Sequence, residues 1–286
     1  MDDGEADERA GDEPVDGKLL LDELEAILKR YVILPAWAAE TLALWALHTY
    51  AFELRDVTTY IGVGSPEKRC GKTTLLGVMS ELVNRPVVAA NISSPAFFRV
   101  IEETRPTLLI DEADTFLQGS DELRGILNAG YSKKTAFVWR VTNDARRNFK
   151  LQTSSFGEAP SLDGRGAEEE ETEERESRVA MFSCWCPKMI CAIGRLPDTL
   201  ADRCILIGME RKRADEECER LRDLDGRGLR ERCERFVREH QSAIAGARPR
   251  GATDLNDRAA DIWEPLLALA DLAGGSWQLV TPRSRC

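Results

Sequence analysis

The residues best suited to chemistry lie between positions 60 and 74, where a short apolar stretch enters a loop that ends in Gly71, Lys72 and Thr73. The apolar spacing after this loop predicts a helix. Backbone N–H groups at a helix start attract anions, a lysine can reach nucleotide phosphates, and a hydroxyl can bind Mg²⁺. The sequence therefore predicts a loop that binds a nucleoside triphosphate. The residues expected to contact it are Pro66, Glu67, Lys68, Arg69, Cys70, Gly71, Lys72, Thr73 and Thr74.

The loop departs from the usual phosphate-loop spacing in one position. The pattern G-x-x-x-x-G-K-[ST] places its first glycine at position 66, where this chain has Pro66, and Gly64 comes two residues too early. An ordinary strand, turn and helix that contain Gly-Lys-Thr by chance is the competing interpretation. A second motif elsewhere in the chain is needed to decide between them.

A second motif occupies positions 106–114 and ends in carboxylates. Its continuous apolar run predicts a buried parallel strand, and Asp111 and Glu112 follow at the carboxyl end, where such sheets bind ligands. We expect Asp111 to bind Mg²⁺ together with Thr73, and Glu112 to orient or deprotonate the attacking water. A solvated turn is the alternative, but the preceding loop favours catalysis. ATP and Mg²⁺ are the predicted ligands, and Lys72 and Glu112 are predicted catalytic residues.

The elements around the two motifs alternate between strand and helix. Strands are predicted at 57–63, 86–91, 107–110, 188–193 and 204–209, and helices at 72–83, 94–104 and 121–131. One strand intervenes between the motifs, which is the order in P-loop NTPases that have an additional central strand and a catalytic glutamate. The predicted fold class is therefore α/β, an AAA+-like P-loop NTPase with a central parallel sheet, an inserted β-hairpin and a C-terminal helical lid.

The inserted hairpin has predicted arms at 136–142 and 179–183 and a long acidic tip at about 144–178. Cations and the rings of Trp139 and Phe149 gather in its first arm, which is the mixture that a single-stranded DNA site requires. A solvated hairpin whose charges serve solubility is the alternative interpretation. The predicted DNA-binding residues are Lys133, Lys134, Arg140, Arg146, Arg147 and Lys150.

Four segments make up the predicted domain organisation. Residues 1–17 form an acidic tail expected to be disordered, and 18–56 form two helices broken at Pro35. The ATPase core spans 57–210, and charged and amphipathic helices over 211–286 form the lid. The second N-terminal helix, 36–52, is almost entirely apolar, but it carries Glu40 and is short for a membrane span. We expect it to be buried against the sheet, and we expect no membrane partner.

Charge and cysteine usage narrow the possible classes of protein. The formal net charge of −11 comes from two acidic stretches, and outside 1–17 and 158–178 the chain has 33 acidic and 35 basic residues, so nucleic acid is not excluded. The eight cysteines show no disulfide framework, and the start has no signal-peptide pattern, which predicts a reduced, cytoplasmic protein. Cys184 and Cys186 could be half of a metal site, but no second pair follows at ligand spacing.

Five stretches together resemble the poorly characterised ATPase domain of prophage, plasmid and phage replication proteins, which often follows a primase module. The resemblance accounts for Pro66, because the family's loop also reads Ser-Pro-Glu-Lys-Arg-Cys-Gly-Lys-Thr. It covers most of 18–277; no primase module is present in these 286 residues, and relatives continue beyond this point, which suggests a truncated or stand-alone form. The five stretches are 65–76, 106–116, 125–130, 196–203 and 257–267.

The resemblance implies a homo-oligomeric ring that takes part in DNA replication, with single-stranded DNA and a primase or other replication protein as partners. It also implies that Arg203 reaches the γ-phosphate bound by a neighbouring subunit; the alternative is a helix-terminal arginine that pairs with Asp198 or Asp202. Two functions remain open. One is a DNA helicase or translocase of a mobile element, and the other is a nucleotide-dependent switch or loader that binds a replication partner without unwinding DNA.

Overall fold

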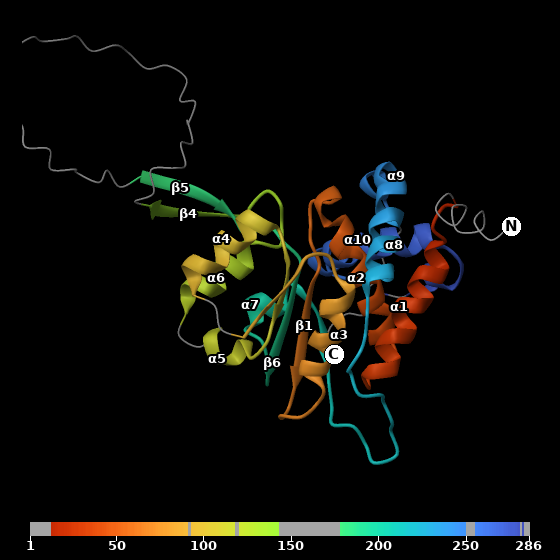
Figure 1. Cartoon of the computed structure of the whole chain (residues 1–286). Helices are drawn as coiled ribbons and strands as arrows, with labels where there is room; N and C mark the ends of the chain where they lie inside the picture. Colours follow the sequence, from red (N-terminus) through yellow and green to blue (C-terminus); the bar gives the residue numbers. More distant parts are fainter. Residues whose placement is uncertain are drawn as a thin grey trace, which may run out of the picture.

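A parallel β-sheet forms the centre of the protein (Figure 1). The computed structural model describes residues 13–90, 93–117, 120–142, 178–249, 255–280 and 282. Five strands are ordered β2-β3-β6-β1-β7, and each neighbouring pair is parallel. The fold is therefore α/β, as predicted. The strands are β1 (Tyr60–Ser65), β2 (Pro86–Ala89), β3 (Thr107–Ile110), β6 (Lys188–Ile193) and β7 (Cys204–Gly208).

The burial of each strand follows its place in the sheet. All four residues of β3 are buried, and β6 is buried except at its last residue, because helices cover both faces of the sheet there. The edge strand β2 has only exposed and half-buried residues. Because β6 lies between β1 and β3, the two sequence motifs end two strands apart at the same edge of the sheet.

One face of the sheet is covered by helices from both ends of the chain (Figure 1). The C-terminal helices pack on α1, α2 and α3 in one hydrophobic cluster, so the segment predicted as a lid belongs to this layer. The helix α2 is buried along almost its whole length, as expected; it packs mainly against α1, α8 and α10, and Trp45 Nε1 donates to the carbonyl of Thr59, just before β1, at 2.8 Å. These helices are α1 (Gly17–Tyr31), α2 (Ala38–Ala51), α3 (Lys72–Leu82), α8 (Arg227–Glu239), α9 (Gln241–Gly246) and α10 (Asp257–Ala273).

The other face carries shorter helices and the predicted hairpin. The hairpin is present as a two-stranded antiparallel ribbon, β4 (Phe137–Thr142) and β5 (Arg178–Ser183). The rings of Phe98 on α4 and Phe182 on β5 lie 4.7 Å apart, which fixes the ribbon to the body. The helices on this side are α4 (Ser94–Thr104), α5 (Ala113–Leu117), α6 (Asp121–Ala129) and α7 (Asp198–Ala201).

A buried lysine organises the backbone around the cysteine pair that precedes β6. Lys188 Nζ donates to the Tyr60 hydroxyl at 2.8 Å and to the carbonyls of Cys184 and Cys186 at 3.0 Å each. Burial raises the pKa of the Cys186 thiol and holds the pKa of Tyr60 well above its ordinary value. The pair therefore supports the start of β6, and no group of three or more His, Cys, Asp or Glu residues suited to a metal occurs among the described residues.

Two predicted boundaries are wrong for reasons of tertiary packing. The acidic tail was expected to extend to residue 17, but Asp16 caps α1 by accepting from the N–H of Leu19 at 3.0 Å, and Val15 is buried. A helix was expected from 211, yet α8 begins at Arg227. The preceding segment runs without regular structure along α3, where Leu221 packs against Gly77. Residues 1–12 lie outside the described part of the chain.

Two further elements, η2 (Phe52–Leu54) and η3 (Gly275–Leu279), are short 3₁₀ turns that follow α2 and α10. Throughout the described ranges, no helix combines the length and the apolar character needed to cross a bilayer. The seven cysteines within the same ranges are free thiols.

Candidate functional site

The loop between β1 and α3 has the backbone of a tight anion-binding turn. Gly71 precedes the first residue of α3 with φ +83°, and Arg69 has φ +68°, so two of three consecutive residues adopt the left-handed conformation. Alternation of this kind turns successive N–H groups toward one point. Within the described part of the chain, none of the backbone N–H groups of 67–74 donates a hydrogen bond to protein. The loop and helix start therefore offer a row of free donors.

Lys72 lies at the centre of this row. Its ammonium donates to the hydroxyl of Ser65, the last residue of β1. Ser65 Oγ in turn donates to the carbonyl of Glu67 at 2.7 Å, which closes the loop on itself. The Lys72 ammonium is thus held at the loop by the neutral hydroxyl of Ser65. A phosphate could take the place of this hydroxyl, because Ser65 carries no charge that would then lack a partner.

The second motif reaches the same place. Thr73 Oγ1 donates to Asp111 Oδ2 at 3.4 Å, and the N–H of Asp111 continues the sheet by donating to the carbonyl of Ala89 at 2.9 Å. Oxygen ligands of Mg²⁺ lie about 2.0–2.1 Å from the ion, so one ion can bridge two oxygens up to about 4.2 Å apart. The two side chains therefore suit the predicted ion in type and separation.

Glu112 follows Asp111 in a strained conformation. Its φ of +50° is unusual for a residue with a side chain, and its N–H donates to Asp111 Oδ1 at 2.9 Å. The side chain is exposed at the carboxyl edge of the sheet. Asp114, the second residue of α5, accepts from the N–H of Ile193 at 3.0 Å and ties the acidic turn to the end of β6. The turn is thereby held in place on two sides.

Below these groups lies the buried thiol of Cys191 on β6. Burial raises its pKa, the charge of Asp111 raises it further, and Lys72 opposes the shift. A neutral thiol under the loop adds no charge of its own to this edge.

Two arginines that the sequence analysis missed lie beside the loop. Arg211 pairs with Glu67 at 2.8 Å and donates from Nε to the carbonyl of Lys68 at 3.3 Å. Arg195 is exposed directly after Gly194, whose N–H donates to the carbonyl of Ser65 at 2.8 Å. The order of the strands brings both arginines to the loop, where their positive charge would suit an anion. The one signal in the sequence is their position, because Arg195 and Arg211 each come shortly after a predicted strand, β6 and β7 respectively.

Arg203 lies at the end of the sheet opposite to the loop, where the strands β1 and β7 begin. It precedes β7, whose first residue, Cys204, pairs with Tyr60 at the beginning of β1, whereas Lys72 follows the end of β1. Its guanidinium donates to the carbonyl of Thr199 and stacks over the ring of Tyr131, 5.0 Å from the centroid. Arg203 therefore does not join Lys72, Thr73, Asp111 and Glu112 within one chain.

The predicted DNA-binding residues separate in the structure. Arg140 pairs with Glu122 at 2.7 Å and lies over the Phe98 ring, on the packed face of the ribbon, so this cation is already engaged within its own chain and its contact with DNA stays a prediction. Lys133 and Lys134 are exposed before β4, and Lys133 Nζ donates to the carbonyl of Glu53 at 3.0 Å. The remaining predicted residues, together with the acidic tip, lie outside the described residues: Arg146, Arg147 and Lys150.

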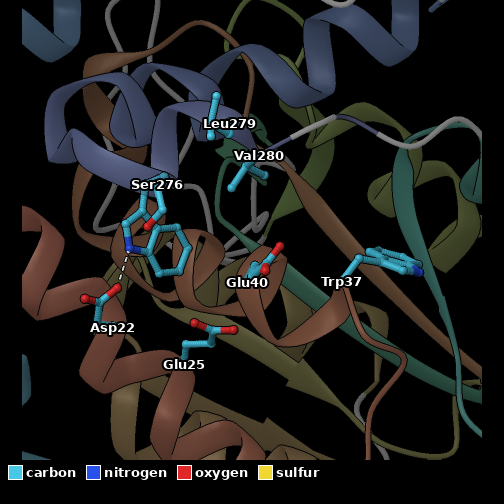
Figure 2. A pocket seen from close by; sticks show the side chains of 8 residues that line it. Asp22, Glu25, Trp37, Glu40, Ser276, Leu279 and Val280 are labelled. Atoms are coloured by element: carbon cyan, nitrogen blue, oxygen red, sulfur yellow. Dashed lines mark hydrogen bonds between the residues drawn. The ribbon is translucent and has the colours of Figure 1, made fainter.

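A cleft of about 1110 Å³ runs from the loop residues Ser65 and Pro66 along β7 to the start of α10. A smaller pocket of about 260 Å³ lies between α1, the start of α2 and η3. Figure 2 shows the carboxylates of Asp22, Glu25 and Glu40 around it. Trp277 Nε1 donates to Asp22 at 2.8 Å, so this pocket marks where η3 is anchored to α1.

Comparison with known proteins reaches only the C-terminal part. A family model described as "Protein of unknown function (DUF3631)" matches residues 208–286. The match begins at the end of β7 and does not include the loop, Asp111 or Glu112. No curated protein matches the sequence. The segment from 208 onward, which contributes Arg211 and the helices α8 to α10, is thus similar to a family whose function is not assigned.

Proposed function

We propose that this protein binds ATP with Mg²⁺ and hydrolyses it. The observation that carries the proposal is the meeting of the two motifs at one edge of the sheet. Free N–H groups at the start of α3, the Lys72 ammonium and the Thr73–Asp111 contact at 3.4 Å lie together there. Backbone donors, a lysine and an oxygen pair for a metal are the parts that phosphoryl transfer needs.

The residues divide the work by chemical type. The N–H groups of 67–74 and Lys72 would hold the phosphates, and Thr73 and Asp111 would hold Mg²⁺, which when bound neutralises charge on the β- and γ-phosphates. Glu112 would accept the proton of the attacking water. Val32 and Met209 lie close to Gly71, since a Cβ there would stand 4.0 Å from Val32 and 3.4 Å from Met209. Apolar groups for contact with the adenine ring of ATP are thus available beside the loop.

Two substitutions test the proposal. Lys72→Ala should abolish ATP binding in calorimetry, because the main phosphate cation is lost. Glu112→Gln should retain binding but lose phosphate release, because the amide cannot take the proton. The controls Lys212→Ala and Glu103→Gln change exposed residues of the same types and should behave as wild type.

Wild-type turnover by Glu112→Gln would show that another group acts as the base. Unchanged ATP binding by Lys72→Ala would show that the loop does not form the ATP site.

Two roles for hydrolysis extend the proposal. The resemblance to replication ATPases supports a ring-shaped helicase or translocase acting on single-stranded DNA. The engagement of Arg140 with Glu122 favours the second candidate, a nucleotide-dependent switch that acts through protein contacts. Stimulation of ATP hydrolysis by single-stranded DNA, measured in the wild type, separates the two roles.

A further inference from the structure

A segment without regular structure joins β7 to α8 and touches the loop that carries Lys72. We name residues 209–226 the strap; in Figure 1 the chain runs there as an irregular coil between the sheet and α8. Near its start, Arg211 pairs with the Glu67 carboxylate at 2.8 Å and donates from Nε to the carbonyl of Lys68 at 3.3 Å. Arg211 therefore ties the strap to the loop between β1 and α3.

This tie is exposed to water. The side chains of Arg211 and Glu67 are 53% and 49% exposed, and all of residues 211–215 are exposed. An exposed ion pair adds little to stability, because water competes for both charges. The contact between strap and loop can therefore open and close while the rest of the protein stays folded.

The far part of the strap is held more firmly. The N–H of Glu219 donates to the carbonyl of Arg30 at the end of α1, at 2.9 Å. Leu221 and Gly226 then lie directly against α3. These anchors leave 210–218 as the part of the strap that can move off the loop.

Glu67 is an unusual residue for a loop that binds phosphates. It is the only acidic residue in 65–74, and a free carboxylate beside a polyphosphate repels it. Its carbonyl accepts from the hydroxyl of Ser65 at 2.7 Å and from the thiol of Cys70 at 3.3 Å, which fixes its backbone within the loop. The carboxylate is therefore kept close to the loop, and Arg211 neutralises it there.

We propose that Arg211 sets the affinity of the loop for ATP by masking Glu67, so that the strap acts as a gate for the nucleotide. With the strap docked, the carboxylate is paired, and the loop presents its N–H donors and Lys72. With the strap undocked, the carboxylate repels the phosphates. Arg211 is thus a positioning residue that acts through Glu67. The inference rests on the proposed function, because it requires ATP at this loop.

Docking of the strap and binding of ATP must favour each other. If docking strengthens ATP binding, ATP strengthens docking by the same factor. One unmasked carboxylate a few ångströms from a polyphosphate, partly screened by water, should change the affinity on the order of tenfold. The gate therefore links the nucleotide to the segment that leads into α8.

Calorimetry with a non-hydrolysable ATP analogue and Mg²⁺ tests the masking. Arg211→Ala should bind the analogue about tenfold more weakly than wild type, and the difference should shrink at high salt. Arg211→Lys should retain most of the affinity, because the charge is kept. Arg211→Ala/Glu67→Gln should recover wild-type affinity, and Glu67→Gln alone should bind at least as tightly as wild type. Lys212→Ala, which removes the next exposed cation, is the control and should bind as wild type does.

Hydrogen exchange of residues 210–218 tests the docking by itself. Without nucleotide, this segment should exchange faster in Arg211→Ala and in Glu67→Gln than in wild type, and Lys212→Ala should match wild type. Addition of the analogue should slow the exchange by up to about tenfold in wild type, but not in Glu67→Gln, where the masked charge is gone.

Four outcomes would overturn the proposal, each in a different way. If Arg211→Ala/Glu67→Gln stays as weak as Arg211→Ala, the arginine contacts the phosphates itself. If Glu67→Gln binds as weakly as Arg211→Ala, the docked strap and not the carboxylate governs affinity. Equal exchange of 210–218 in wild type and both ion-pair variants would show that the pair does not hold the strap. Wild type that binds no analogue, with the exchange differences present, would refute the proposed function and the gate, and only the strap contact would stand.

Discussion

At the scale of single residues, the site depends on side chains that are distant in sequence and close in space. Thr73 and Asp111 are separated by 38 positions, yet their oxygens lie 3.4 Å apart. Each follows a parallel strand, and parallel strands deliver their carboxyl ends to one edge. His48 shows the opposite case, since it is fully buried on α2 away from that edge and serves the fold. Its Nε2 accepts from the N–H of Thr59 at 3.2 Å.

The pH dependence of stability should report on His48. Burial, with a smaller effect from the charge of Arg55, lowers its pKa from 6.5 to about 3. Between these values the unfolded chain binds a proton that the folded chain does not, so stability falls as pH falls below 6.5. Protonation of His48 in the unfolded chain should lower the free energy of unfolding by about 2 kcal/mol between pH 7 and pH 5.

Urea unfolding of wild type and His48→Gln at both pH values measures this contribution. The variant should lose less stability between pH 7 and pH 5, by about 2 kcal/mol, because its amide does not titrate. An equal loss in both proteins would mean that His48 is protonated in the folded state.

At the scale of elements, α3 is held along its length by the segment after β7. Gly226 lies so close to α3 that a Cβ would meet the Glu81 carbonyl oxygen at 1.9 Å. Arg230 donates to the same oxygen at 2.7 Å and pairs with the Glu81 carboxylate at 3.2 Å. The start of α8 therefore supports the far end of the helix whose first turn carries Lys72.

Gly226→Ala should destabilise the protein by about 1–3 kcal/mol, because the methyl group must displace backbone. Gly228→Ala is the matched control two residues later, where a Cβ meets nothing within 4 Å, and it should change stability by less than about 1 kcal/mol. Urea unfolding at neutral pH compares the two. Equal stabilities would show that α8 and α3 separate easily at this point.

At the scale of the whole molecule, the sheet separates Arg203 from the loop of its own chain. A six-residue strand such as β1 spans about 17–20 Å, so this guanidinium cannot reach phosphates held by Lys72 in the same chain. Arg195 differs, because it follows β6 at the loop edge. An arginine at the far edge can complete a site only on a neighbouring copy.

Arg203→Ala should lower ATP hydrolysis by about 10³ to 10⁵ if this residue acts on a neighbour's γ-phosphate. Mixing it with Lys72→Ala should restore activity, because some sites then combine an intact lysine with an intact arginine. Arg195→Ala mixed with Lys72→Ala should not recover, since both residues belong to one site. Normal hydrolysis by Arg203→Ala would reduce its role to the contacts with Thr199 and Tyr131.

Local patterns in the sequence were sufficient for most elements and for the site motifs. The apolar run before Asp111 and the arms of the hairpin appear in the structure as predicted. Each depends on periodicity or on a continuous buried run, which neighbouring residues determine. The prediction that Lys72, Thr73, Asp111 and Glu112 would converge also needed only the rule for parallel strands.

Tertiary structure alone decided the features that depend on distant partners. Arg140 reads as a free cation in sequence, but Glu122 and Phe98 draw it to the packed face of the ribbon. The segment before Arg227 is rich in helix-forming residues, yet it has no regular structure where Leu221 and Gly226 contact α3. Burial and ion pairs between remote segments outweigh local propensity, which amounts to less than about 1 kcal/mol per residue. Such contacts exist only once the chain has folded, so composition and spacing do not reveal them.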